Sequence, residues 1–198
     1  ILDLVGNALT ALPYTGGQSY TIDKSAPTVV SILRANQSPT NAASVGYAVT
    51  FSEAVSGVGA SDFALTLSGI TGATITGVGG GPTTYTVSVS TGTGSGTLRL
   101  DIPGTASIVD QVGNPLSGLP YETGESYTID KIAPTVLSIL RADPNPTNAG
   151  SVDYTVTFSE AVNGVSTSDF TLTTSGIIDM GITGVSGGPT TYNVTVDT

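Results

Sequence analysis

Residues 19–24 read Ser-Tyr-Thr-Ile-Asp-Lys, and the same six residues return at 126–131. Two further motifs recur at this spacing of 107 residues, Phe-Ser-Glu-Ala-Val at 51–55 and 158–162 and Gly-Pro-Thr-Thr-Tyr at 81–85 and 188–192. A shift of 107 aligns residues 1–91 with 108–198 without a gap, and 62 of the 91 aligned positions are identical. Solenoid repeats are about 20–50 residues long, whereas about 100 residues make a whole β-sandwich domain. The sequence therefore predicts an array of tandem domains.

An Ala-Pro pair marks each expected domain boundary. Asp23 and Asp130 are each followed three residues later by Ala-Pro. Proline has no N–H for a sheet ladder and forces the residue before it into an extended conformation. We therefore predict three segments: 1–23 as the C-terminal strand segment of a preceding repeat, 24–130 as one complete domain, and 131–198 as a domain lacking its last strands.

Each repeat contains seven short stretches with the pattern of half-buried β-strands. In residues 44–51, Val45, Tyr47, Val49 and Phe51 alternate with small or polar residues. Strict alternation places one face of a strand in the core and the other in solvent. The other expected strands are 28–33, 63–67, 73–78, 85–89, 98–102 and 126–130, the last repeated at 19–23. The predicted fold is all-β, with tandem immunoglobulin-like β-sandwich domains of about seven strands each.

The composition excludes most catalytic chemistry. The 198 residues include 15 Asp and Glu, 5 Lys and Arg, no His and no Cys, with a net charge of -10. Without Cys there is no disulfide scaffold or cysteine nucleophile, and without His the commonest general base is missing. The deficit of cations makes nucleic acid an unexpected partner. No apolar run approaches the roughly 18 residues that a membrane span needs. We expect no enzyme and no membrane insertion in this segment.

Several motifs carry a resemblance to a known family. They are Asp-x-x-Ala-Pro-Thr at 23–28, Val-Thr-Phe-Ser-Glu-Ala-Val at 49–55, Ser-Asp-Phe at 61–63, Asp-x-x-Gly-Asn at 110–114 and Tyr-Thr-Ile-Asp at 127–130. Together they resemble the tandem bacterial Ig-like repeats of very large surface and secreted adhesins, over essentially the whole chain. The resemblance implies an extracellular or bacterial cell-surface stalk or fibre. It implies neighbouring repeats of the same chain or filament as partners, an unknown surface or glycan ligand elsewhere, and calcium at the domain junctions.

Acidic and amide side chains near the expected boundaries are the candidate metal ligands. Asp3, Asn7 and Asp23 are assigned to the first junction, and Asp110, Asn114 and Asp130 to the second. Glu53 and Glu160 follow their strands at a turn and are expected to face the same junctions. Calcium takes six to eight oxygen ligands from such groups. The alternative interpretation is structural, because Asp and Asn also bond their own backbone in turns and acidic residues at strand ends deter edge pairing.

Three functions from different classes fit this pattern. The first is a structural stalk module of a repeat protein, in which similar folded domains joined in series increase the length of the protein. The second is a carbohydrate-binding or spacer module of a secreted enzyme, which requires an exposed aromatic platform, whereas the alternating Tyr and Phe are expected to face inward. The third is an extracellular filament subunit that assembles by strand donation. We expect the first.

Overall fold

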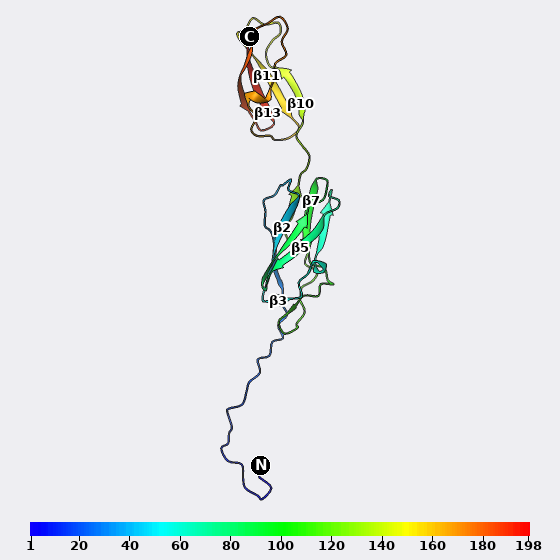
Figure 1. The fold of residues 1–198 in the computed structure, drawn as a ribbon, viewed down its shortest axis with the longest axis vertical. Coiled ribbons are helices and arrows are strands. Elements are labelled where there is room, and N and C mark those ends of the chain that lie inside the picture. The colour runs from blue at the N-terminus through cyan, green and yellow to red at the C-terminus, as the bar shows by residue number, and fades with distance from the viewer. The chain divides into compact units, whose positions relative to one another are not determined.

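The computed structural model describes all residues from Ile1 to Thr198, and the chain divides into two compact units (Figure 1). Unit 1 is Ile1–Lys131 and unit 2 is Ile132–Thr198. Both consist of β-structure with a single three-residue 3-10 helix each, η1 (Ala60–Asp62) and η2 (Thr167–Asp169). Neither helix is long and apolar enough to cross a bilayer.

Two sheets face each other in residues 24–130 of unit 1. The first has the order β1-β2-β6-β5 and the second the order β4-β7-β9, with antiparallel neighbours throughout. A two-residue ladder joins β3 to β8 beside them. The strands are β1 (Val29–Arg34), β2 (Ser44–Phe51), β3 (Val55–Ser56), β4 (Ala64–Ser68), β5 (Thr74–Gly80), β6 (Thr84–Ser90), β7 (Gly96–Asp101), β8 (Val109–Asp110) and β9 (Ser126–Ile129).

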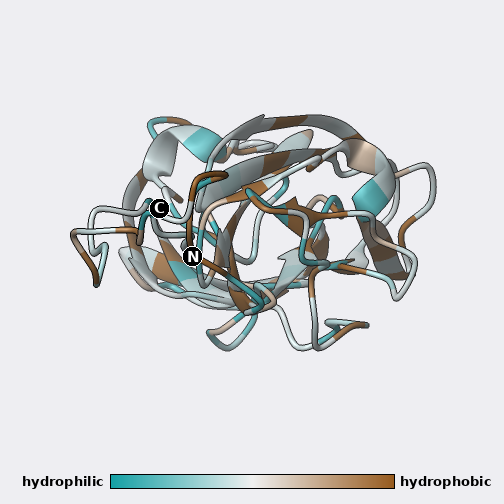
Figure 2. Cartoon of the chain, turned by 90° about the horizontal axis from the view of Figure 1, so that it is seen from below, coloured by the Kyte–Doolittle hydropathy of each residue, from teal (hydrophilic) through white to brown (hydrophobic).

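The core lies between these two sheets. In β2 the residues from Val45 to Phe51 alternate between buried and half-buried, so the period-2 pattern of the sequence becomes the inner face of the sheet. Opposite it, β7 buries its own apolar residues fully. The rings of Tyr47 and Tyr127 meet edge to face, with their centroids 5.1 Å apart, and join the two sheets. Figure 2 shows apolar and polar segments alternating along the ribbons. The all-β, Ig-like sandwich predicted from the sequence is confirmed.

The seven expected strands all occur in residues 24–130, with ends that differ by at most two residues from the expected ranges. The sequence did not predict the short β3–β8 pair. Val55 pairs with Asp110 and Ser56 with Val109 across it. Two residues are too few to show a period, so a pair of this length leaves no pattern in the sequence.

Unit 2 contains one sheet, of order β10-β11-β13-β12. Its strands are β10 (Val136–Arg141), β11 (Ser151–Phe158), β12 (Gly181–Gly187) and β13 (Thr191–Asp197). They match the first sheet of unit 1 one for one under the shift of 107 residues. Residues 171–175, the counterpart of β4, form no strand. In unit 1 the partner of β4 is β7.

The N-terminal segment, residues 1–23, is exposed throughout and contains one isolated bridge, between Leu2 and Ala8. Residues 19–23 form no strand in this structure, and the assignment of residues 1–23 to a preceding repeat stays a prediction. Residues 19–22 have the same sequence as β9, but β9 is a strand because β7 pairs with it. A strand is defined by its partner, and residues 19–23 have none here.

Candidate metal centre

The loop of residues 110–114 is held by the carboxylate of Asp110. Its Oδ1 accepts the backbone N–H groups of Val112, Gly113 and Asn114 at 2.7–2.9 Å. Its Oδ2 accepts the side-chain amide of Asn114 at 2.7 Å. The motif Asp-x-x-Gly-Asn therefore closes on itself, with Gly113 at φ 98°, a value that favours glycine.

The equivalent loop at residues 3–7 forms the same way. Asp3 Oδ1 accepts the N–H groups of Val5 and Asn7, and Oδ2 accepts the Asn7 amide at 2.8 Å. These residues lie in the exposed N-terminal segment, without the domain that surrounds Asp110. The loop therefore needs only its local sequence, as the structural interpretation of the motif expects.

Three carboxylates meet at one end of unit 1. Asp23, Glu53 and Asp110 each place an oxygen within 4.8 Å of the other two. Glu53 reaches Asp110 because the next strand, β3, pairs with β8. Asp23 is brought in by Asn114, whose Nδ2 donates to the carbonyls of Asp23 (3.4 Å) and Ser25 (3.1 Å). We refer to Asp23, Glu53 and Asp110 as the acidic cluster.

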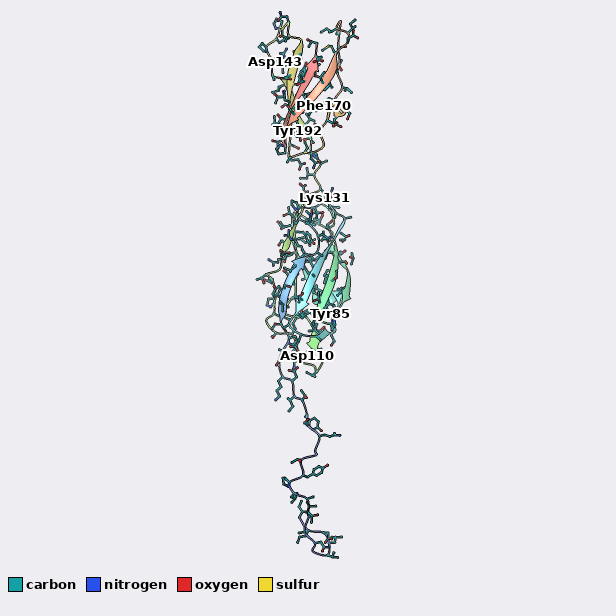
Figure 3. All side chains as sticks on the ribbon, turned by 90° about the vertical axis from the view of Figure 1, so that its left-hand side faces the viewer. Tyr85, Asp110, Lys131, Asp143, Phe170 and Tyr192 are labelled. Atoms are coloured by element: carbon teal, nitrogen blue, oxygen red, sulfur yellow. The ribbon has the colours of Figure 1, made fainter.

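This grouping differs from the one expected from the sequence. Asp110 and Asn114 lie with Asp23 and Glu53, rather than with Asp130. Asp130 instead follows β9 and accepts a hydrogen bond from Ser95 Oγ at 3.3 Å. Figure 3 labels Asp110 and Lys131, and these residues mark opposite ends of the sandwich of unit 1. Asp3 and Asn7 bond each other, and Glu160 belongs to unit 2.

The acidic cluster lines a small hollow together with Ala54, Gln111 and Val112. Gln111 adds an amide oxygen that the sequence analysis did not select. The only feature of the sequence that points to Gln111 is its position inside the Asp-x-x-Gly-Asn loop. Asp110 is buried, Glu53 is half-buried and Asp23 is exposed. The hollow therefore combines carboxylate and amide oxygens at partial exposure, the donor set that suits a hard divalent cation.

The oxygens of the cluster are not equally available to a cation. A carboxylate has about four lone-pair sites, and Asp110 Oδ1 already receives three N–H groups. Asp110 Oδ2 receives one donor and Asp23 Oδ1 receives the Ser25 N–H. The sites on Asp110 Oδ2, on Asp23 and on Glu53 that receive no donor are the ones open to a cation.

The cluster carries concentrated negative charge. Burial alone would raise the pKa of Asp110, but the hydrogen bonds from Asn114, Val112 and Gly113 outweigh it and hold that pKa below the ordinary value. Asp110 is therefore ionised at neutral pH. The two salt bridges of the chain, Arg34–Glu125 and Arg99–Asp101, involve none of the three carboxylates.

A buried carboxylate outside the expected site also emerges from the structure. Asp62, 2% exposed, accepts the backbone N–H and hydroxyl of Ser107 and the N–H of Gly59. It fixes η1 to the segment before β8. Its counterpart Asp169 bonds only within its own turn, to Ser166. Asp62 is thus a structural residue, because its oxygens are used by unit 1 itself.

No protein-family profile matches the chain, and no curated protein is similar to it. Among solved structures, the chain is similar to FdeC, a broadly conserved Escherichia coli adhesin, with 16% identity and a TM-score of 0.42. The match covers 84% of this chain and 54% of that one, so this chain spans about half the length of that structure.

Proposed function

We propose that the chain is a structural stalk module of a bacterial cell-surface or secreted repeat protein, of the kind found in adhesins. In this role, folded domains joined in series hold a distant part of the protein away from the point where the protein is attached. The observation that carries the proposal is the gapless period of 107 residues, with one full period folded as a sandwich. The expected partners are neighbouring Ig-like repeats of the same chain.

The path of the chain through unit 1 supports this proposal. The chain enters the sandwich beside Asp110, where Asn114 holds the carbonyls of Asp23 and Ser25, and leaves it at Lys131 at the other end. Domains whose ends lie at opposite poles extend when they are joined in series. Asn114 further restrains the entry by bonding both sides of Lys24. The acidity of the chain adds solubility and repulsion between modules.

The aromatic residues favour a stalk over a carbohydrate-binding module. All six Tyr and Phe side chains of residues 24–130 are buried or half-buried: Tyr47, Phe51, Phe63, Tyr85, Tyr121 and Tyr127. Sugar recognition by stacking requires an aromatic face open to solvent. The inward Tyr and Phe predicted from the sequence agree with these positions.

Electron microscopy of the natural repeat protein tests the stalk. We expect a beaded rod whose length increases in proportion to the number of 107-residue periods. A compact particle, in which the repeats fold back on one another, would contradict the proposal.

We further propose that the acidic cluster binds Ca²⁺ and stiffens the entry to each domain. Asp23 comes from the incoming segment, and Glu53 and Asp110 come from the domain, so an ion held by all three ties one to the other. Under the shift of 107, the counterparts of Asp23 and Glu53 are Asp130 and Glu160. Asp3 is the counterpart of Asp110 and would serve a preceding domain.

Thermal unfolding with and without calcium tests this site. Extracellular calcium modules bind with dissociation constants of about 0.1–1 mM, so Ca²⁺ at about 10 mM stabilises the folded state by about 1.4–2.7 kcal/mol. Glu53→Gln removes a ligand but no hydrogen bond of the fold, and we expect it to abolish most of this gain. Glu122→Gln, an exposed residue outside the cluster, is the matched control. If Ca²⁺ leaves the melting temperature of the wild type unchanged, the calcium proposal is wrong and the stalk proposal stands.

A further inference from the structure

The strand β5 (Thr74–Gly80) forms an edge of the first sheet of unit 1 and is labelled in Figure 1. Its neighbour on one side is β6. On the other side, no backbone hydrogen bond joins it to another segment of the chain. An edge of this kind presents a row of unpaired N–H and C=O groups, which is a template for pairing with another chain.

The hairpin between β5 and β6 sets which backbone groups face this free edge. The Gly81 N–H donates to the carbonyl of Thr84 at 2.7 Å, and from there hydrogen-bonded and non-hydrogen-bonded pairs alternate along the antiparallel ladder. Gly79 therefore directs its backbone groups to β6. Val78 and Gly80 direct their N–H and C=O groups away from β6, toward the edge.

The edges formed by β1 and β9 are not free in the same way, because they are joined to each other. The Glu125 N–H donates to the carbonyl of Ile32 at 3.0 Å. The Asp130 N–H, directly after β9, donates to the carbonyl of Thr40 at 2.9 Å. The sandwich is therefore closed on this side, and its open edges are those of β4 and β5.

Charge distinguishes these two open edges. The strand β4 lies beside the ion pair Arg99–Asp101 of β7, and the hydroxyl of Thr66 bonds to Asp101. The exposed residues of β5 and β6 are Thr, Ser and Gly. In residues 54–98 the one charged residue is Asp62, which is 2% exposed. In a chain with a net charge of -10, the edge of β5 is thus a place where a second copy meets no opposing charge.

The corresponding edge of unit 2, formed by β12, carries charge. Asp179 stands at the position of Gly72 with a similar backbone, at φ 62° against 73°. Asp197 of β13 lies opposite the first residue of β12, where unit 1 has Ser90. Both carboxylates are exposed, and charged side chains at an edge deter pairing. The edge that is both free and uncharged is therefore the one formed by β5.

We propose that two copies of this chain associate through β5 of unit 1, which pairs with β5 of the second copy in antiparallel orientation about a two-fold axis. Two identical antiparallel strands are self-complementary, as an isologous contact requires. With Gly79 of each copy on the axis, Val78 of either copy lies opposite Gly80 of the other. These two residue pairs make two backbone hydrogen bonds each, and the two first sheets become one continuous sheet. The inference depends on neither the stalk nor calcium.

The side chains of β5 leave room for this contact. Thr74, Thr76 and Gly79 are exposed, and β5 contains no Pro, which would remove an N–H from the edge. A Cβ added at Gly79 meets no atom within 4 Å. In strand pairing of this kind the main-chain hydrogen bonds supply the affinity. A charge placed at Gly79 therefore acts on the pairing and leaves the fold of unit 1 intact.

Sedimentation equilibrium of the 198-residue protein tests the pairing. Over a roughly hundredfold range of concentration, we expect the average mass to rise from the 19.7 kDa of one chain toward twice that mass and to stop there. Gly79→Glu places two carboxylates opposite each other and should weaken association about tenfold or more. Gly104→Glu is the matched control, because Gly104 is exposed, lies outside β5 and has the same open space around a new Cβ.

A mixture of two charge variants tests the register. Gly79→Lys alone should be as monomeric as Gly79→Glu, whereas an equimolar mixture of the two should form dimers, because opposite charges then face each other across the axis. A monomeric wild type overturns the proposal, as do particles larger than two copies. Equal weakening by Gly104→Glu overturns it too, and so does a mixture that associates no better than either variant alone.

Discussion

The hydroxyl of Tyr127 joins the last strand of the domain to the first sheet, and its removal by Tyr127→Phe isolates that link. The ring stays in its edge-to-face contact with Tyr47. Two short hydrogen bonds are lost, the one accepted from the Asn36 N–H and the one donated to the Gly46 carbonyl, together with a longer contact of 3.5 Å to Asn36 Oδ1. The Gly46 carbonyl keeps a second donor, the Ala35 N–H at 2.9 Å. The Asn36 N–H is left without a partner.

The magnitude follows from these contacts. A net hydrogen bond contributes about 1 kcal/mol, and a buried donor left unpaired costs about 1–3 kcal/mol. Since Gly46 remains bonded and the site is only partly buried, the loss is near the lower end. We expect unit 1 to lose about 2 kcal/mol of unfolding free energy. With urea slopes of about 1–3 kcal/mol/M for small domains, the midpoint should fall by about 1 M.

The matched control is Tyr20→Phe, in the same six-residue motif. Tyr20 is 93% exposed, and surface changes of this kind stay within about 0.5 kcal/mol. Urea unfolding is followed by circular dichroism. If the two variants lose the same stability, the hydrogen bonds of Tyr127 do not hold the last strand and the reasoning fails.

Two further predictions concern carboxylates of unit 1. Asp62→Ala leaves two backbone N–H groups unpaired in a partly buried site and should cost about 2–3 kcal/mol in urea unfolding, whereas Asp169→Ala should cost less than about 1 kcal/mol. Equal losses would contradict the role given to Asp62. The depressed pKa of Asp110 contributes stability that is present above the ordinary Asp value of about 3.9 and is lost as the pH falls through the folded-state value. Unfolding measured from pH 7 to pH 3 should therefore show stability falling below about pH 4, and the same fall in Asp110→Asn would exclude Asp110 as its source.

The β-sandwich could be predicted because the sequence patterns that encode its strands are local and occur in both repeats. The alternation in residues 44–51 encodes a strand with one buried face, and the period of 107 residues shows where each domain begins again. The loop of Asp110 was equally predictable, since Asp3 builds the same bonds without a surrounding domain.

The acidic cluster could be predicted only in its members. The sequence points to Asp23, Glu53 and Asp110 alike, but it predicts that Asp110 lies at the junction with Asp130. Sequence order places Asp110 nearer to Asp130 along the chain, whereas the β3–β8 pair and Asn114 bring it to Asp23. Those contacts join residues that are up to 91 positions apart, and no local pattern encodes them.

The six residues Ser-Tyr-Thr-Ile-Asp-Lys show which properties the sequence determines and which the tertiary structure determines. By itself the sequence determined the fold class, the period and the apolar character of this motif. Only the tertiary structure decided that residues 126–129 are a buried strand and that residues 19–22 are not. The physical reason is that a strand is stabilised by the ladder and the face it packs against. At 126–129 these are β7 and the first sheet, and at 19–22 both are absent.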